Sequence, residues 1–271
     1  MPSGHLNKLR VTAADPIQYE LPLGDQYIPL NPVLGHVCKL TFSGHIQCIH
    51  CQRQIKKSYN QGYCFPCVQR LAACDICIVR PEKCHYAAGT CREPDWAQTH
   101  CFTPHIVYLA NTSGLKVGIT RQSNLPTRWI DQGAIQALPL LQVTQRHHAG
   151  LLESLIAKTV NDKTNWRNML KGLAPPLDLP AQRDTLLTQH ENAIQNLCGE
   201  DGDDWESETG NPIDFHYPIL QTPDKVTALN LDKTPEIEGT LLGIKGQYLL
   251  LDIGVLNIRK YAGYDVTFTA S

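Results

Sequence analysis

The chain has no long apolar run. None of its uninterrupted apolar segments approaches the roughly 20 residues that cross a bilayer, and its polar first residues lack the apolar run of a secretory signal. Internal repeats and low-complexity runs are also absent. We therefore expect no membrane partner and a cytoplasmic location, where thiols stay reduced and serve metals more often than disulfides.

The chain carries little net charge, and that charge is unevenly distributed. Residues 1–150 contain 14 Lys and Arg against 8 Asp and Glu, whereas residues 151–271 contain 10 against 18, which gives the total of −2. A hydrophobic content of 42% is enough for real cores and excludes a disordered chain. The basic first part favours a polyanionic partner such as DNA or RNA on the N-terminal side.

Cysteine is the residue type that is concentrated. Nine of the eleven cysteines lie between residues 48 and 101. Cys48 and Cys51 form one C-x2-C pair, and Cys64 and Cys67 form a second pair twelve residues later. Each pair makes a tight knuckle, and the gap accommodates a hairpin that completes four sulfur ligands, as in a zinc ribbon. A closed set of four thiolates predicts a structural Zn²⁺, with an iron–sulfur cluster as the alternative.

A second group of candidate ligands follows the first. Six residues compete for four positions, so the sequence predicts a second structural zinc without choosing its ligands. The candidates are Cys74, Cys77, Cys84, His85, Cys91 and Cys101, with His100 and His105 as lesser ones. Beside the first knuckle lie Arg53, Lys56 and Lys57, which we expect to contact a phosphate backbone, with an ordinary solvated surface as the alternative.

The pattern along the chain predicts an α+β fold. From residue 105 onward it reads as strand, turn, strand, helix, strand and helix, and glycine turns alternate with apolar strands near the C-terminus. We predict an irregular or β-rich lead-in (1–37), a zinc-binding cysteine module (38–104), a central domain (105–175), a linker with a helix and an acidic loop (176–217) and a small antiparallel β-unit (218–271).

Residues 105–168 resemble the GIY-YIG nuclease fold. Ile106-Val107-Tyr108 and Lys116-Val117-Gly118 stand where that family has its two strand triplets. Arg128 matches the family's helix arginine, and Glu153 matches its later leucine-flanked glutamate. The resemblance covers roughly a quarter of the chain and implies a three-stranded sheet with helices.

The resemblance also implies a chemistry for these residues. Glu153 would hold Mg²⁺ or Mn²⁺, and Arg128 would stabilise the charge of a phosphoryl transition state. Tyr108 would position or deprotonate water, while Arg121 and Lys116 would help to grip the backbone. Lys116 replaces the second tyrosine of the pattern, and this departure favours binding without cleavage.

Taken whole, the chain resembles an uncharacterised bacterial family, a domain of unknown function. The likeness lies in the segments that begin at Gly89, His105, Lys116 and Arg128. Three functions follow from these observations. The first is a metal-dependent nuclease or nuclease-derived nucleic-acid-processing protein. The alternatives are a non-catalytic, zinc-dependent DNA- or RNA-binding module and, given the acidic C-terminal half, a protein-interaction scaffold with an unknown partner.

Overall fold

The computed structural model describes residues 1–271 except 161–162, 200–205 and 208. The fold is mixed α/β, with several antiparallel sheets and a cysteine cluster in the N-terminal half. Within the described residues, no helix combines the length and apolar character needed to cross a membrane. The acidic loop predicted at 199–208 lies for most of its length outside the described residues.

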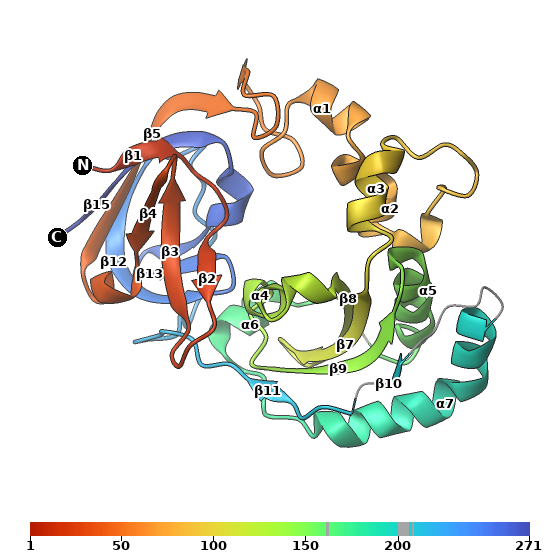
Figure 1. Cartoon of the computed structure of the whole chain (residues 1–271). Coiled ribbons are helices and arrows are strands. Elements are labelled where there is room, and N and C mark those ends of the chain that lie inside the picture. Colours follow the sequence, from red (N-terminus) through yellow and green to blue (C-terminus); the bar gives the residue numbers. More distant parts are fainter. Residues whose placement is uncertain (161–162, 200–205, 208) are drawn as a thin grey trace.

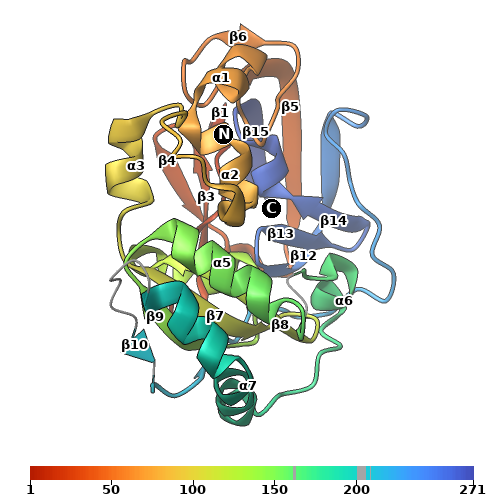
Figure 2. The same cartoon turned by 90° about the vertical axis from the view of Figure 1, so that its right-hand side faces the viewer.

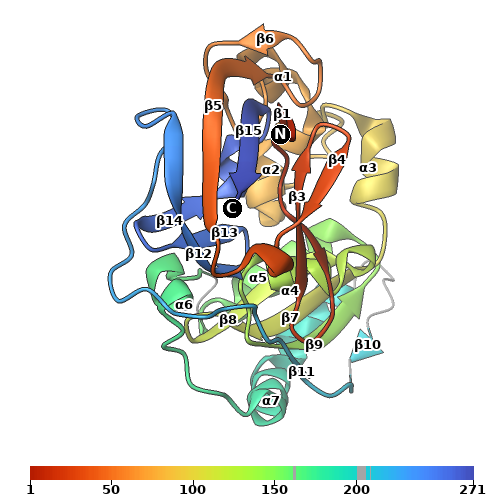
Figure 3. The ribbon, with the colours of Figure 1, turned by 90° about the vertical axis from the view of Figure 1, so that its left-hand side faces the viewer.

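The largest sheet joins the two ends of the chain (Figures 1 and 3). Its strand order is β1-β15-β5-β12-β13-β14, with β6 beside β5, and all neighbours are antiparallel. The lead-in and the C-terminal β-unit, which the sequence presented as separate segments, therefore share one sheet. Residues 38–47, predicted as the start of the cysteine module, belong to the same sheet as part of β5, so the module begins at residue 48. Its strands are β1 (Ser3–His5), β5 (Val37–Gln47), β6 (Gln54–Ile55), β12 (Glu236–Lys245), β13 (Tyr248–Leu251), β14 (Gly254–Asn257) and β15 (Tyr264–Ala270).

A three-stranded sheet packs against the largest one. It contains β2 (Arg10–Thr12), β3 (Gln18–Leu23) and β4 (Gln26–Pro29) in sequence order. Leu21 and Leu23 of β3 share a hydrophobic core with Leu40 of β5 and Phe268 of β15. We call β1–β5 together with β12–β15 the terminal β-domain.

The central domain contains the third sheet, with strand order β10-β9-β7-β8 and β11 beside β9. The order of elements predicted from residue 105 onward is the observed one. The strands are β7 (His105–Asn111), β8 (Leu115–Arg121), β9 (Gln136–Val143), β10 (Glu206–Ser207) and β11 (Ile213–Asp214), and the helices are α4 (Thr127–Asp131), α5 (Arg146–Ile156), α6 (Trp166–Lys171) and α7 (Leu179–Gly199).

Strand β7 is buried on both faces. Val107 and Leu109 pack on the core formed with α5 and α7, which cover this side of the sheet (Figure 2). Ile106 and Tyr108 point to the other side and join the core of the terminal β-domain. A continuous apolar run is the pattern of a strand covered on both sides, and here it attaches the central domain to the terminal β-domain.

Residues 48–104 form a metal module that reaches from β5 to α5 (Figure 1). Its helices are short: α1 (Phe65–Arg70), α2 (Ile76–Val79) and α3 (Pro94–His100). Its hydrophobic core cluster consists of Leu71 and three cysteine side chains. So small an apolar core gives a segment of this length little stability, and four of its cysteines lie close enough together to hold a metal ion that would add to it.

The module packs against α5 at a glycine. A Cβ placed on Gly150 would lie 2.5 Å from the ring of Pro81, far inside van der Waals contact. Gly150 therefore allows the 3₁₀ turn Pro81–Lys83 to lie directly on the helix. This contact brings the module beside the first turns of α5.

Candidate functional site

The first cysteine cluster has the geometry of a closed metal site. The four sulfurs of Cys48, Cys51, Cys64 and Cys67 all lie within 4.8 Å of one another, and those of Cys51 and Cys64 are 3.7 Å apart. A tetrahedral zinc with bonds of about 2.3 Å places its sulfurs about 3.8 Å apart. These four residues can hold a structural zinc ion.

The pKa values of the thiols in this cluster are also those expected of a site that binds a cation. Burial and the neighbouring thiols raise the pKa of Cys67 to about 12. Burial acts in the same direction on Cys48, but backbone N–H donors outweigh it and lower the pKa of that thiol to about 6. Four adjacent sulfurs therefore cannot all ionise at neutral pH unless a metal ion offsets their charge.

A second site lies where the three parts of the fold meet. A pocket of about 500 Å³ is lined by α2 and α3 of the metal module, by β8, α4 and α5 of the central domain, and by the 3₁₀ turn Ile258–Tyr261 of the terminal β-domain. We call it the arginine pocket. Its charged lining residues are Arg121, Arg128, Arg146, Arg259 and Glu153.

The guanidinium groups of the arginine pocket repel one another. Burial lowers the pKa of Arg146 and of Arg259, and the nearby charge of Arg128 lowers both further. The carboxylate of Glu153 partly offsets this at Arg146. A polyanion entering the pocket would relieve the repulsion, so the site is suited to bind phosphate groups.

Of the residues predicted to form one site, the structure brings three to this pocket. Arg121, Arg128 and Glu153 all line it. Tyr108 does not line it: the side chain is fully buried, and its hydroxyl donates to Oε1 of Gln132 at 2.8 Å. Burial raises the pKa of Tyr108, and the charge of Arg128 opposes this shift. A buried, protonated phenol does not fit the predicted role of deprotonating water.

Tyr108 occupies space that only glycine leaves open. Gly118 is its cross-strand partner, and a Cβ there would lie 2.7 Å from the phenol oxygen. We expect Gly118→Ala to cost about 1–3 kcal/mol of unfolding free energy, because the ring has to move within a packed core. Urea denaturation measures it. Gly210, whose Cβ position is open, is the control, and Gly210→Ala should change stability by less than about 0.5 kcal/mol. Equal midpoints for the two variants would contradict this packing.

The other basic residues predicted to contact nucleic acid do not line the arginine pocket. Lys116 is buried, with its ammonium group 3.5 Å from the hydroxyl of Thr164. Thr120 of the pocket lies four positions further along β8. Four residues of extended strand span about 13 Å, so the backbone of Lys116 is well removed from Thr120. The other predicted contacts, Arg53, Lys56 and Lys57, are exposed on the first knuckle and do not line the arginine pocket.

Three titratable residues of the pocket were not predicted for this site. His100 was considered only as a metal ligand, while Arg146 and Arg259 were given no function. Arg259 is 131 positions from Arg128 in the sequence, so only the joining of the chain ends brings the two together. Arg146 could have been noticed, because it begins the helix that also bears Glu153.

The second group of candidate ligands divides in the structure. Cys77, Cys84, Cys91 and Cys101 line one small cavity. Cys74 instead packs against the first cluster. His105 is buried in β7, where its Nδ1 lies 2.6 Å from the carbonyl of Thr103, and burial lowers its pKa to about 4.

Comparison with known proteins identifies a family. A protein-family model described as "Protein of unknown function (DUF2797)" matches residues 35–266. This range spans the metal module, the central domain and strands β5 and β12–β14 with the first residues of β15, but not β1–β4. No curated protein and no solved structure matches the chain.

Proposed function

Because the chain belongs to the DUF2797 family, whose description assigns no activity, we propose its function from the arginine pocket: the protein binds DNA or RNA by the phosphodiester backbone and hydrolyses it. The observation that supports this proposal is the meeting of four arginines and one glutamate in one pocket of about 500 Å³. The proposal assumes a reducing cytoplasm, in which the cysteine clusters hold structural zinc.

Arg128 and Glu153 would carry the charge chemistry. The guanidinium of Arg128 presents a planar fork of donors that matches two oxygens of a phosphate. In the transition state negative charge spreads over the equatorial oxygens, and a fixed cation stabilises it. Glu153 is the one carboxylate among the described residues that line the pocket. It would hold Mg²⁺ or Mn²⁺, which supplies charge neutralisation when bound.

A different residue from the one predicted would accept the proton. Nδ1 of His100 lies 3.0 Å from the carbonyl oxygen of Trp96 and 2.8 Å from the hydroxyl of Thr99, which can accept the same hydrogen. A hydrogen on Nδ1 for that bond leaves the lone pair on Nε2, which has no hydrogen-bond partner within the described part of the chain. An imidazole in this tautomer can act as general base toward a water. Tyr108 would act by keeping Arg128 in place.

A non-catalytic nucleic-acid-binding module is the second candidate. It is favoured by where the structure places Tyr108 and Lys116, the two residues at the tyrosine positions of the GIY-YIG-like triplets. Tyr108 is fully buried, and Lys116 lies at the far end of β8 from the pocket. In this alternative the four arginines bind the backbone, and Glu153 only limits their mutual repulsion.

Binding itself is tested by an arginine variant and a salt series. We expect Arg259→Ala to weaken binding of single-stranded DNA or RNA about tenfold, because one charge-assisted hydrogen bond is lost. The slope of log K against log salt should fall by about one. Fluorescence anisotropy at several salt concentrations measures both.

The control for this variant is the next residue. Lys260 is exposed on the same 3₁₀ turn and does not line the arginine pocket. Lys260→Ala should change the affinity less than about twofold. Equal losses for the two variants, or parent binding that is insensitive to salt, would rule out phosphate recognition at this site.

A further inference from the structure

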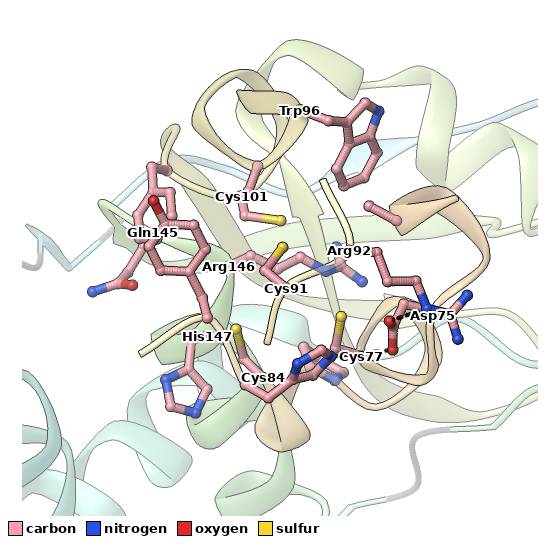
Figure 4. Close-up of a pocket in the computed structure, with 16 residues that line it drawn as sticks. Asp75, Cys77, Cys84, Cys91, Arg92, Trp96, Cys101, Gln145, Arg146 and His147 are labelled. Atoms are coloured by element: carbon pink, nitrogen blue, oxygen red, sulfur yellow. Dashed lines mark ion pairs between the residues drawn. The ribbon is translucent and has the colours of Figure 1, made fainter. Parts of the chain in front are cut away.

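We propose that Cys77, Cys84, Cys91 and Cys101 form a second tetrathiolate site that binds zinc and fixes one wall of the arginine pocket. All four line a single cavity of about 30 Å³. Figure 4 shows their sulfurs turned toward a common space. The sulfurs lie farther apart than those of the first cluster, which are all within 4.8 Å of one another. They come from α2, from the turn after it, from the loop before α3 and from the residue after α3.

The size of the cavity fits an ion. A volume of about 30 Å³ exceeds the roughly 10–15 Å³ that one water-sized sphere requires, but it leaves no room for an organic substrate. Aromatic and aliphatic side chains such as Trp96, Phe102 and Pro81 complete the lining. Four soft donors around a small cavity match the ligand set of a structural zinc site, and a bound zinc ion would draw the four sulfurs to about 3.8 Å from one another.

The other candidate ligands are engaged elsewhere. Asp75 accepts from Nε of Arg92 at 2.6 Å and lies 3.4 Å from Nε2 of His85. Nδ1 of His85 is 2.8 Å from the hydroxyl of Thr90. Although a ligand atom of Asp75, of Cys77 and of His85 could approach one ion, the carboxylate and both ring nitrogens already have partners. These residues support the loops that bear the thiols.

Arg146 connects this site to the arginine pocket. It lines both cavities, and its Nη2 donates to the carbonyl of Ile78, next to Cys77, at 2.7 Å. Zinc bound by four thiolates has a net charge of about −2, which a neighbouring guanidinium offsets. The metal therefore holds Arg146 where it faces an incoming phosphate. This last step rests on the proposed function; the metal site itself does not.

Metal analysis tests the site. We expect the purified protein to contain about two equivalents of zinc per chain, and Cys84→Ser or Cys91→Ser to contain about one. Cys74→Ser, the same chemical change outside both ligand sets, should keep two. Retention of two equivalents in Cys84→Ser and Cys91→Ser would overturn the proposal, as would loss of one in His85→Gln. Visible absorption of an iron–sulfur cluster in the purified protein would overturn the assignment to zinc.

A ligand exchange covers the case in which the serine variants fail to fold. The Cys84→His variant should still bind metal. When the protein is loaded with cobalt, this variant should lower the intensity of sulfur-to-cobalt charge transfer at this site by about a quarter, because one thiolate in four is replaced. An unchanged spectrum would overturn the ligand set.

The link to the arginine pocket has its own readout. Folded Cys84→Ser that has lost one zinc should bind nucleic acid about tenfold more weakly than Cys74→Ser. Equal binding by the two variants would overturn the link and leave the metal site standing. If the parent protein binds no nucleic acid, the proposed function fails while the metal measurements still decide the site.

Discussion

A Glu153→Gln variant will bind nucleic acid at least as tightly as the parent protein and cut it about 100- to 1,000-fold more slowly. Glutamine preserves the shape of the side chain but removes the charge that would hold a divalent cation. It also removes the carboxylate that repels phosphate from a pocket with four arginines. The cutting rate is measured on plasmid, single-stranded DNA and structured RNA in the presence of Mg²⁺ or Mn²⁺. Fluorescence anisotropy measures the affinity of the same variants for nucleic acid.

A nearby glutamate provides the control for this experiment. Glu82 follows Pro81, a pocket residue, but does not itself line the arginine pocket. Glu82→Gln should bind and cut like the parent. Cutting by Glu153→Gln at the parental rate would remove Glu153 from the reaction. Binding without cutting by the parent under every metal condition would leave the non-catalytic module as the function.

Loss of metal from the first cysteine cluster is expected to unfold the metal module. Zinc contributes about 10–16 kcal/mol to small zinc-binding folds at neutral pH, as much as the entire stability of many domains. The module's own core cluster contains Leu71 and three cysteines, so little else stabilises it. Cys64→Ser should lose about one equivalent of zinc and become sensitive to protease between residues 48 and 101. Limited proteolysis with mass spectrometry locates the cuts.

The control for Cys64→Ser is again Cys74→Ser. Cys74 lies beside the first cluster without belonging to its four ligands. The variant should keep its zinc and its resistance to protease. Protease resistance of Cys64→Ser or of chelator-treated protein would show that side-chain packing, and not the metal, holds the module together.

The sequence predicts best where a local spacing determines a local geometry. Two C-x2-C pairs close a knuckle at each end of a hairpin, so Cys48, Cys51, Cys64 and Cys67 could be assigned without any knowledge of distant contacts. Strands β7 and β8 are equally local, since an apolar run, a turn and a second run define a hairpin. Arg128 and Glu153 were expected to share one site, and they line one pocket.

Contacts between distant segments could not be predicted in the same way. Nothing in the composition of 37–47 or 218–271 indicates that β5 pairs with β12 and β15, because strand pairing leaves no spacing signature in a single sequence. Arg259 reaches the arginine pocket only through that pairing. The second cysteine group was ambiguous for a related reason: six, six and nine residues separate its four proposed ligands, and only the packed loops distinguish Cys74 from Cys77.

The pairing of the first strands with the last ones also sets an order of events during synthesis. Strand β5 leaves the ribosome about 190 residues before its neighbours β12 and β15 exist. Until then its edges stay open, while the thiols that follow it in the chain are already able to capture metal. Closure of the largest sheet therefore has to wait for synthesis of residues 236–270, and a nascent chain that stalls before residue 236 exposes two long unpaired edges to aggregation.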